Sequence, residues 1–288
     1  MTEDGTMRKV YMILMLLLTV SVASAQQKEL FVLHTSDTHS RIEPLEPTSA
    51  DRYRGMGGVA RRSAYIKQMR ELHPNLLLLD CGDISQGTPY YNIFQGELEI
   101  KCMNLMGYDA MTIGNHEFDF GMDNMVRIFK MANFPIVCSN YNFKGTALEK
   151  LVQPYIILKR DGMKIGIFGL SPELEGLVRE ANCPGVVFED PATTANEMVK
   201  ILRDKKKCDV VICLSHLGYD YSDQPEQNSD NVVFTKTHGI DLVLGGHSHS
   251  YMEAPVYLKD ADGKTVTLFH TGRNGTFVGT YEMTLTKK

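Results

Sequence analysis

Short apolar runs alternate with amphipathic stretches along most of the chain after residue 30. Most of these runs are hydrophobic at successive positions rather than at alternate ones, which is typical of strands covered on both faces. Between them, apolar positions recur at helical spacing. We expect strands at 30–35, 75–80, 109–114, 134–140, 164–171, 208–215, 240–246 and 265–272, and helices at 59–72, 98–106, 122–132 and 193–206.

This alternation predicts a layered α/β or α+β domain. The sequence has no internal repeat and no low-complexity linker, and 288 residues suit one large domain. We therefore expect a single catalytic domain at 26–288. The segment 220–230 is polar and rich in turn-forming residues, so it is the most loop-like part of the chain.

The first 25 residues have the features of a cleavable signal peptide. A short positive stretch begins at Met7, an apolar stretch follows, and small residues end at Ala25. We expect cleavage near Ala25 and a periplasmic or secreted mature chain without a membrane span. An uncleaved anchor is the alternative, although the apolar stretch is shorter than the about 20 residues that a bilayer span needs. Met7 is an alternative start, because Glu3 and Asp4 are unusual ahead of a positive stretch.

Charge and cysteine content narrow the function classes. The net charge is −5 and the only basic run is at 203–207, so a nucleic-acid polymer is not expected as a partner. The 6 cysteines show no CxxC spacing, and a chain of this length can form a core without disulfides. The sequence leaves their pairing open.

Polar side chains with metal-binding or acid–base chemistry follow the apolar runs where those runs end. In open α/β sheets, ligands bind at the carboxyl edge because the loops there converge. Carboxylate, imidazole and amide groups favour a metal site, and no GxSxG motif indicates a nucleophilic serine. The candidates are Asp37, His39, Asp83, Asn115, His116, His216, His247 and His249.

The spacing of these residues supports a metal site. Asp37 and His39 are separated by one residue, and in an extended loop both side chains can reach one ion. His247 and His249 have the same spacing after a glycine pair, which permits an unusual backbone and close packing. Asp83 has two carboxylate oxygens and can bridge two ions.

Three other histidines have simpler explanations. His34 is expected in the core or behind the ligands, whereas His73 and His238 are expected at the surface or at helix ends. We assign none of them a catalytic role.

The motifs DTH, GD, GNHEFD, SHLG and GGHSH, in this order, resemble those of the calcineurin-like binuclear metallophosphoesterases. The stretches GNHEFD and LLLLDCGDISQGTP resemble the 5′-nucleotidase branch, specifically its catalytic N-terminal domain. The resemblance extends from about residue 30 to the end. It implies two mixed β-sheets packed as a sandwich and flanked by helices.

The resemblance also implies two divalent metal ions, which could be Mn, Zn, Co, Fe or Mg. His116 and Asp119 match the catalytic His–Asp pair, in which the carboxylate orients the imidazole. Glu117 matches no assigned role, and we expect it to support the ligands or cap a helix. One ion would be held by Asp37, His39, Asp83 and His249, and the other by Asp83, Asn115, His216 and His247.

The implied activity is an exported phosphohydrolase that cleaves 5′-nucleotides or related phosphate monoesters by attack of a metal-bound hydroxide. One alternative is a phosphodiesterase or pyrophosphatase of the same superfamily, acting on a cyclic nucleotide or a UDP-sugar. Another is a non-catalytic metal-binding subunit of a two-chain complex, which would not need His116 and Asp119. The native metal and the true substrate stay open.

The sequence departs from related patterns in two places, one that concerns the metal and one that concerns the substrate. Gln86 stands where purple acid phosphatases have a tyrosine, which argues against an iron–tyrosinate site. The nucleotidase branch normally continues into a second domain that binds the base, and we find no such segment here. The chain alone should therefore discriminate little between nucleotides, unless a loop such as 220–230 or a separate chain resembling that domain supplies a base site.

Overall fold

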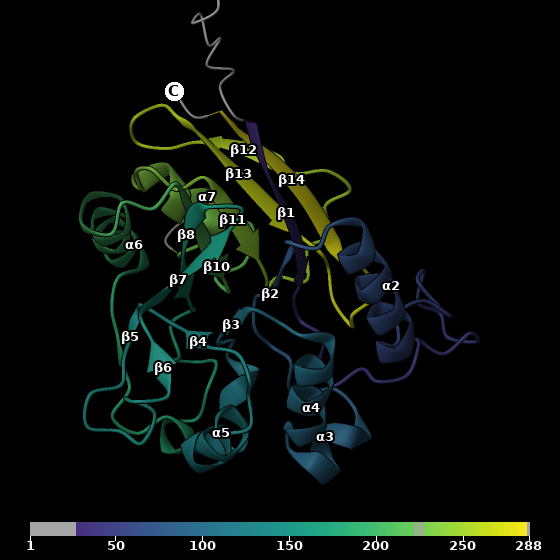
Figure 1. Cartoon of the computed structure of the whole chain (residues 1–288). Coiled ribbons are helices and arrows are strands. Elements are labelled where there is room, and N and C mark those ends of the chain that lie inside the picture. The colour runs from purple at the N-terminus through teal and green to yellow at the C-terminus, as the bar shows by residue number, and fades with distance from the viewer. Residues whose placement is uncertain (1–26, 222, 224–226, 287–288) are drawn as a thin grey trace, which may run out of the picture.

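The computed structural model describes residues 27–221, 223 and 227–286 (Figure 1). The predicted signal peptide at 1–25 lies outside these residues. Among the helices described, none is both long enough and apolar enough to span a bilayer.

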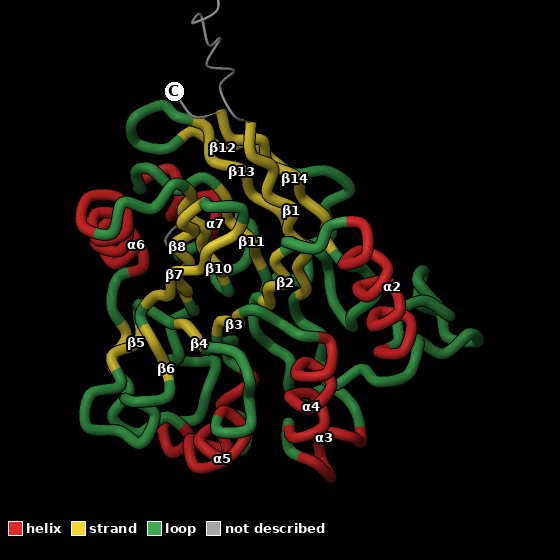
Figure 2. Tube along the Cα trace, in the orientation of Figure 1, coloured by secondary structure: helices red, strands yellow, loops and turns green. Residues whose placement is uncertain are grey.

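The molecule has two six-stranded sheets. Figures 1 and 2 show them at its centre. The first has the order β14-β1-β2-β3-β4-β6 and is parallel except for β14. It comprises β1 (Gln27–Thr35), β2 (Leu77–Asp80), β3 (Ala110–Thr112), β4 (Ile136–Val137), β6 (Val152–Gln153) and β14 (Gly279–Thr286).

The second sheet has the order β12-β13-β11-β10-β8-β7, with antiparallel strands at both edges and parallel strands between them. It comprises β7 (Tyr155–Arg160), β8 (Met163–Leu170), β10 (Val210–Ser215), β11 (Leu242–Gly245), β12 (Val256–Lys259) and β13 (Thr265–His270). A small separate sheet pairs β5 (Tyr141–Asn142) with β9 (Val187–Phe188).

Helices cover the outer face of each sheet (Figure 1). Those on the first sheet are α2 (Val59–Leu72), α3 (Pro89–Phe94), α4 (Glu97–Met106) and α5 (Gly121–Phe129). Those on the second are α6 (Pro191–Lys200), which continues as a π-helical turn η3 (Ile201–Lys205), and α7 (Asp230–Val233). Short 3₁₀ turns are η1 (His116–Phe118), η2 (Glu180–Asn182) and η4 (Phe234–Lys236).

The leucine run around β2 explains the layered packing. Successive side chains of a strand point to opposite faces. Leu77 and Leu79 therefore pack into the core between the two sheets, whereas Leu76 and Leu78 pack against the helices α2, α4 and α5. All four side chains are buried. A run without polar alternation is what a strand with two buried faces requires, and the predicted sandwich flanked by helices is confirmed.

Every apolar run predicted as a strand contains one, and α2 has the predicted bounds. The π-helical turn η3 replaces the last α-helical turn that we expected before residue 206. The sequence did not indicate β7, β12 or β14. These are edge strands. The residues of β12 alternate between half-buried and exposed, whereas the apolar run 155–158 in β7 was not predicted as a strand.

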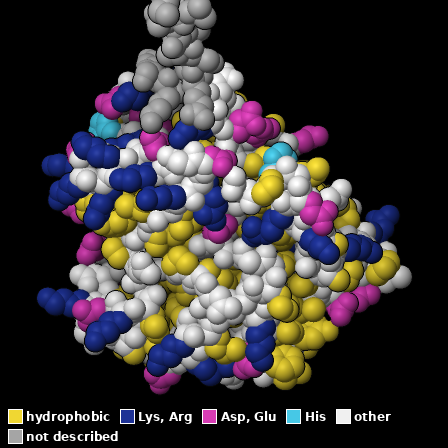
Figure 3. All heavy atoms as spheres, in the orientation of Figure 1, with side chains coloured by type: hydrophobic (Ala, Val, Ile, Leu, Met, Phe, Trp, Pro, Cys, Tyr) yellow, Lys and Arg dark blue, Asp and Glu magenta, His cyan; other side chains and the backbone are white. Residues whose placement is uncertain are grey.

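The surface carries mixed charge. On the face drawn in Figure 3, lysine and arginine side chains gather near α6, with acidic side chains interspersed among them. Hydrophobic side chains are exposed over α3 and α4, where Ile93 and Leu105 have 71% and 88% of their surface in solvent. All six cysteines lie in the described part of the chain as free thiols.

Candidate metal centre

The predicted ligands lie in loops that follow β1, β2, β3, β10 and β11. Strand register explains why these loops meet: Thr35 at the end of β1 is paired with Asp80 at the end of β2, and Ser215 is paired with Gly245. Parallel strands thus end at a common edge in each sheet. The structure brings side chains from all five loops together there.

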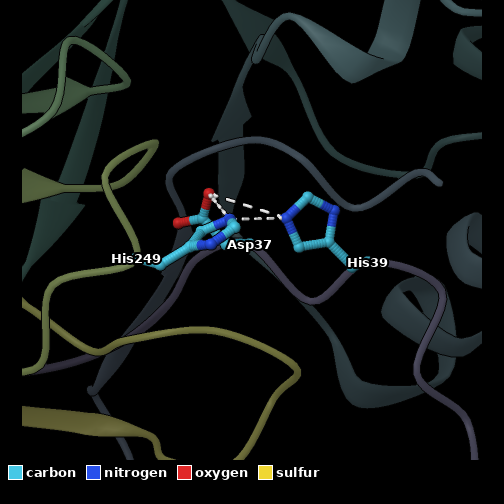
Figure 4. A group of neighbouring side chains, drawn as sticks. All are labelled: Asp37, His39 and His249. Carbon is cyan, nitrogen blue, oxygen red and sulfur yellow. Dashed lines mark hydrogen bonds and ion pairs between the residues drawn. The ribbon is translucent and has the colours of Figure 1, made fainter. Parts of the chain in front are cut away.

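Asp37, His39 and His249 form a first cluster (Figure 4). The Nε2 atoms of His39 and His249 are 2.8 Å apart. They lie 4.0 Å and 3.6 Å, respectively, from Oδ1 of Asp37. The three ligand atoms therefore point toward one small volume, as a shared cation would require.

Asp83, His216 and His247 form a second cluster beside the first. Nε2 of His216 lies 3.1 Å from Oδ2 of Asp83. The same nitrogen lies 3.9 Å from Oδ1 of Asp37. The two clusters are therefore adjacent.

Backbone contacts fix the tautomers of two histidines. Nδ1 of His39 lies 3.1 Å from the carbonyl oxygen of Ser85, and Nδ1 of His216 lies 2.6 Å from that of Cys81. A carbonyl only accepts hydrogen bonds, so each Nδ1 carries a proton, and each Nε2 is the nitrogen left to bind a cation, which in His216 requires loss of the second proton. Oδ1 of Asn115 is buried without a hydrogen-bond partner, which is unfavourable unless a cation lies against it. This donor set fits a divalent metal ion.

The electrostatic balance of the site agrees with cation binding. Burial raises the pKa of Asp37 to about 7. Burial opposes a charged His216, but Asp83 and Asp37 outweigh it and raise the pKa of His216 to about 10. Burial lowers the pKa of His247 to about 3 and of His249 to about 4, so both imidazoles are neutral. A proton on His216 and a metal ion compete for the same carboxylates.

Left-handed backbone conformations gather at the ligands. The φ angles of Asp37, His39 and Asp83 are 50°, 47° and 54°, and those of His247 and His249 are 74° and 54°. Such angles are unfavourable for residues other than glycine and cluster at functional sites. The expected extended loop at Asp37 and His39 is therefore wrong, although the two side chains do converge.

The glycine pair before His247 is needed because a side chain would not fit there. It is not needed for an unusual backbone, since neither glycine has a positive φ. A Cβ atom on Gly246 would lie 2.9 Å from Oδ2 of Asp37 and 2.9 Å from Nδ1 of His216. The expected close packing is confirmed, whereas the unusual backbone belongs to the histidines themselves.

His116 and Asp119 form a hydrogen-bonded pair beside the first cluster. Nδ1 of His116 lies 3.0 Å from Oδ2 of Asp119, and the two side chains are 33% and 34% exposed. This hydrogen bond raises the pKa of His116, against the effect of burial. The ring of His116 meets that of His39 edge-on with 5.5 Å between centroids. The imidazole is thus oriented at the border between the cluster and solvent.

Glu117 connects two ligand-bearing loops. Its buried carboxylate accepts hydrogen bonds from the backbone N–H groups of Asp83 (2.9 Å), Ile84 (3.0 Å), Ser85 (3.3 Å) and Gly114 (2.6 Å). The sequence predicted that Glu117 supports the ligands or caps a helix, and these four hydrogen bonds correspond to the first of these roles. Glu117 holds the loop after β2 against the loop after β3.

Sequence reasoning missed two features near the ligands. Asp230 is buried and accepts hydrogen bonds from Ser215 (2.5 Å) and from Nε2 of His270 (2.6 Å), so the segment that we expected to be a loop ends in a buried ion pair. Nη1 of Arg273 lies 3.4 Å from Nδ1 of His249. Neither Asp230 nor Arg273 belongs to a motif, so no sequence pattern indicated these contacts.

The three histidines without an assigned role are His34, expected in the core or behind the ligands, and His73 and His238, expected at the surface or at helix ends. His34 is fully buried and packs edge-on against Phe269. The ring of His73 stacks on Phe31, and His238 forms an ion pair of 3.0 Å with Asp262.

Curated proteins similar to this chain are 5′-nucleotidases. The Bos taurus 5′-nucleotidase is 32% identical over 278 residues, covering 89% of this chain and 46% of that protein. The Gloydius brevicauda snake venom 5′-nucleotidase is 33% identical and covers 87% of this chain and 44% of that protein. The Bacillus subtilis trifunctional nucleotide phosphoesterase protein YfkN is 32% identical over 78% of this chain and 16% of its own length. The chain therefore spans half or less of the length of these relatives.

Solved structures have the same fold. A 5′-nucleotidase precursor from Thermus thermophilus superimposes with a TM-score of 0.79 at 32% identity, covering 88% of this chain and 51% of that one. The calcineurin-like phosphoesterase YfkN from Bacillus subtilis gives a TM-score of 0.75 at 28% identity, covering 91% and 87%. Residues 31–251 match the calcineurin-like phosphoesterase family. The chain therefore belongs to the calcineurin-like phosphoesterases, which are metal-dependent phosphoester hydrolases.

Proposed function

We propose that this protein is a two-metal phosphohydrolase that cleaves 5′-nucleotides or related phosphate monoesters. The observation that carries the proposal is the pair of adjacent ligand clusters, with His216 3.9 Å from Asp37, beside the His116–Asp119 pair. The relatives named 5′-nucleotidases support the substrate class.

The proposed ligands divide between two ions that share one carboxylate. Asp83 is suited to the shared position, because β2 lies between β1 and β3, whose following loops carry Asp37 and Asn115, and because its two oxygens can serve two ions. Bound divalent ions would polarise the phosphoryl group and lower the pKa of a water molecule. We assign Asp37, His39, Asp83 and His249 to one ion and Asp83, Asn115, His216 and His247 to the other.

His116 and Asp119 provide the proposed acid–base function of the chain. Asp119 accepts the hydrogen bond from Nδ1 of His116, which fixes the tautomer and stabilises the protonated ring. An imidazole held in this way can donate a hydrogen bond or a proton to the phosphoryl or leaving-group oxygen as negative charge develops there.

Glu117 has a supporting role in this proposal. It fixes three consecutive backbone N–H groups beginning at Asp83, the shared ligand, and the N–H of Gly114 just before Asn115. We infer that its carboxylate sets the position of Asp83 relative to Asn115 and thereby the geometry of the second ion.

A phosphodiesterase activity is the second candidate, and the relative named trifunctional nucleotide phosphoesterase favours it.

We also propose export, based on the predicted signal peptide at residues 1–25. The separate partner chain expected from the sequence has no support among the similar proteins.

We expect a chelator to abolish ester hydrolysis and Mn, Co or Zn to restore it, since mixed carboxylate and imidazole ligands suit these ions. Asp83→Asn should reduce activity more than His39→Asn, because it weakens the binding of both ions. Phosphate release should be measured metal by metal on nucleotides, aryl phosphates and a cyclic nucleotide. Full activity of metal-free protein would contradict the proposal.

We expect His116→Ala to keep its bound metal and to lose roughly 10²–10⁴-fold in kcat, the range for a general acid or base. Asp119→Ala should lose less, because the imidazole remains. The matched control is His238→Ala, which removes a histidine–aspartate pair remote from the ligands and should leave kcat unchanged. Loss of metal from His116→Ala with an unchanged rate per bound ion would refute this assignment.

We expect Glu117→Gln to lower the free energy of unfolding by about 1–3 kcal/mol, because the amide places an NH₂ group against backbone N–H donors. Metal affinity should also fall, as measured by titration calorimetry. Glu175→Gln, at an exposed site, is the control. Unchanged stability and affinity in Glu117→Gln would show that the carboxylate does not position Asp83.

A further inference from the structure

A cavity of about 320 Å³ opens next to the first ligand cluster. It lies between the segment around residues 45–53 and the segment 272–277, and His249 forms part of its wall. Its volume lies at the lower end of the about 300–1,000 Å³ that small-molecule sites occupy. The cavity is therefore large enough to hold a small organic group beside the candidate metal centre.

Three aromatic rings line this cavity. Tyr251 and Phe277 are stacked with 4.1 Å between centroids, and Tyr53 meets Phe277 edge-on at 4.9 Å. None of the three belongs to either hydrophobic core, and Tyr251 is 40% exposed. Aromatic rings that gather in a wall open to solvent are typical of binding surfaces, because their faces can stack on a flat ligand.

Polar groups join this aromatic wall to the ligand cluster. Arg273 lines the cavity, and its Nη1 lies 3.4 Å from Nδ1 of His249. The backbone N–H of Asn274 donates to the carbonyl oxygen of Asp37 at 2.7 Å. The segment that carries Arg273 and Phe277 is thus held directly against the loop of the first cluster. A phosphate ester bound at the cluster would have this cavity available for its organic part.

The other lining groups match the chemistry of a nucleoside. Arg52 lies over the ring of Tyr53 at 4.4 Å and, with Arg273, supplies hydrogen-bond donors. Asp51 adds a carboxylate acceptor that can receive hydrogen bonds from the amino group of a base. An aliphatic alcohol would use the donors and acceptors but could not stack on the rings.

We propose that this cavity binds the aromatic base of a nucleoside monophosphate, or the ring of an aryl phosphate, while the phosphate lies at the metal centre. This inference rests on the proposed function. It replaces the expectation that the chain alone discriminates little, since the cavity is built entirely from its own residues. The chain should favour nucleotide and aryl esters over alkyl phosphates.

The kinetic test uses adenosine 5′-monophosphate, p-nitrophenyl phosphate and glycerol phosphate as substrates of the full chain. We expect Tyr251→Ala to raise KM for the first two by about tenfold, the order of one lost base–aromatic stack, and to leave glycerol phosphate within about twofold. Tyr251→Phe keeps the ring and should behave like the parent. Tyr257→Ala, at a tyrosine that is 64% exposed on β12, is the matched control.

A binding test needs no turnover. Adenosine, which lacks a phosphate, should bind the chelator-treated chain in saturation-transfer NMR, and Tyr251→Ala should lose this signal. If Tyr251→Ala fails to fold, Tyr53→Ala supplies the same test from the other segment. Adenosine binding that is unchanged in both variants, or an equal rise in KM for glycerol phosphate, would overturn the assignment.

Failure of the proposed function has a different signature. A chain that hydrolyses no ester with any metal, yet binds adenosine through Tyr251, would overturn the hydrolase proposal and support the cavity assignment. If all three esters are hydrolysed with the same KM by the parent and by Tyr251→Ala, the hydrolase proposal is supported and the cavity assignment is overturned.

Discussion

The structure depends on holding two buried carboxylates, Asp37 and Asp83, close to each other and to several imidazoles. A buried charge is very unfavourable unless opposite charge or hydrogen bonds balance it. Here His216 lies near both carboxylates, at 3.9 Å and 3.1 Å. Two divalent ions can balance this negative charge more completely than one protonated imidazole. The need for such balance explains why the candidate ligands form a single connected centre.

The fold provides this concentration of charge because two largely parallel sheets end at neighbouring edges. The loops after β1, β2, β3, β10 and β11 each contribute candidate ligands, and the strands behind them are buried on both faces. The loops have left-handed residues at most ligand positions, each of which costs about 1–3 kcal/mol. The hydrogen bonds to Glu117 and the packing around Gly246 hold the loops in these conformations. The packed core thus stabilises loop conformations at the carboxyl edge of the sheets that would be unfavourable in an isolated peptide.

Sequence patterns predicted the parts of the structure that depend on local chemistry. Strands buried on both faces produce uninterrupted apolar runs such as the leucines before Asp80, and helix α5 buries Met125, Ile128 and Phe129, which recur at helical spacing. Ligand types and their spacing indicated the metal site, because paired residues such as Asp37 and His39 must reach one point. The edge strand β12 left no comparable signal, since its residues alternate between half-buried and exposed.

Features that depend on contacts between distant segments could not be predicted. Asp230 meets His270 only because α7 packs beside β13, and nothing in the local sequence of either residue indicates the ion pair. The aromatic cavity has the same origin, since Tyr53 and Phe277 are brought together by the fold. The four hydrogen bonds of Glu117 also join separate loops, so the motif GNHEFD indicated its proximity to the site but not its function.

The most direct test of this account is a crystal structure of the metal-loaded protein with anomalous scattering data collected at the metal absorption edge. The account predicts two ions per chain with Asp83 bound to both, one ion also contacting Asp37, His39 and His249, and the other contacting Asn115, His216 and His247. Ligand distances should be about 2.0–2.2 Å. A single ion, or two ions that do not share Asp83, in protein with full hydrolytic activity would contradict the account.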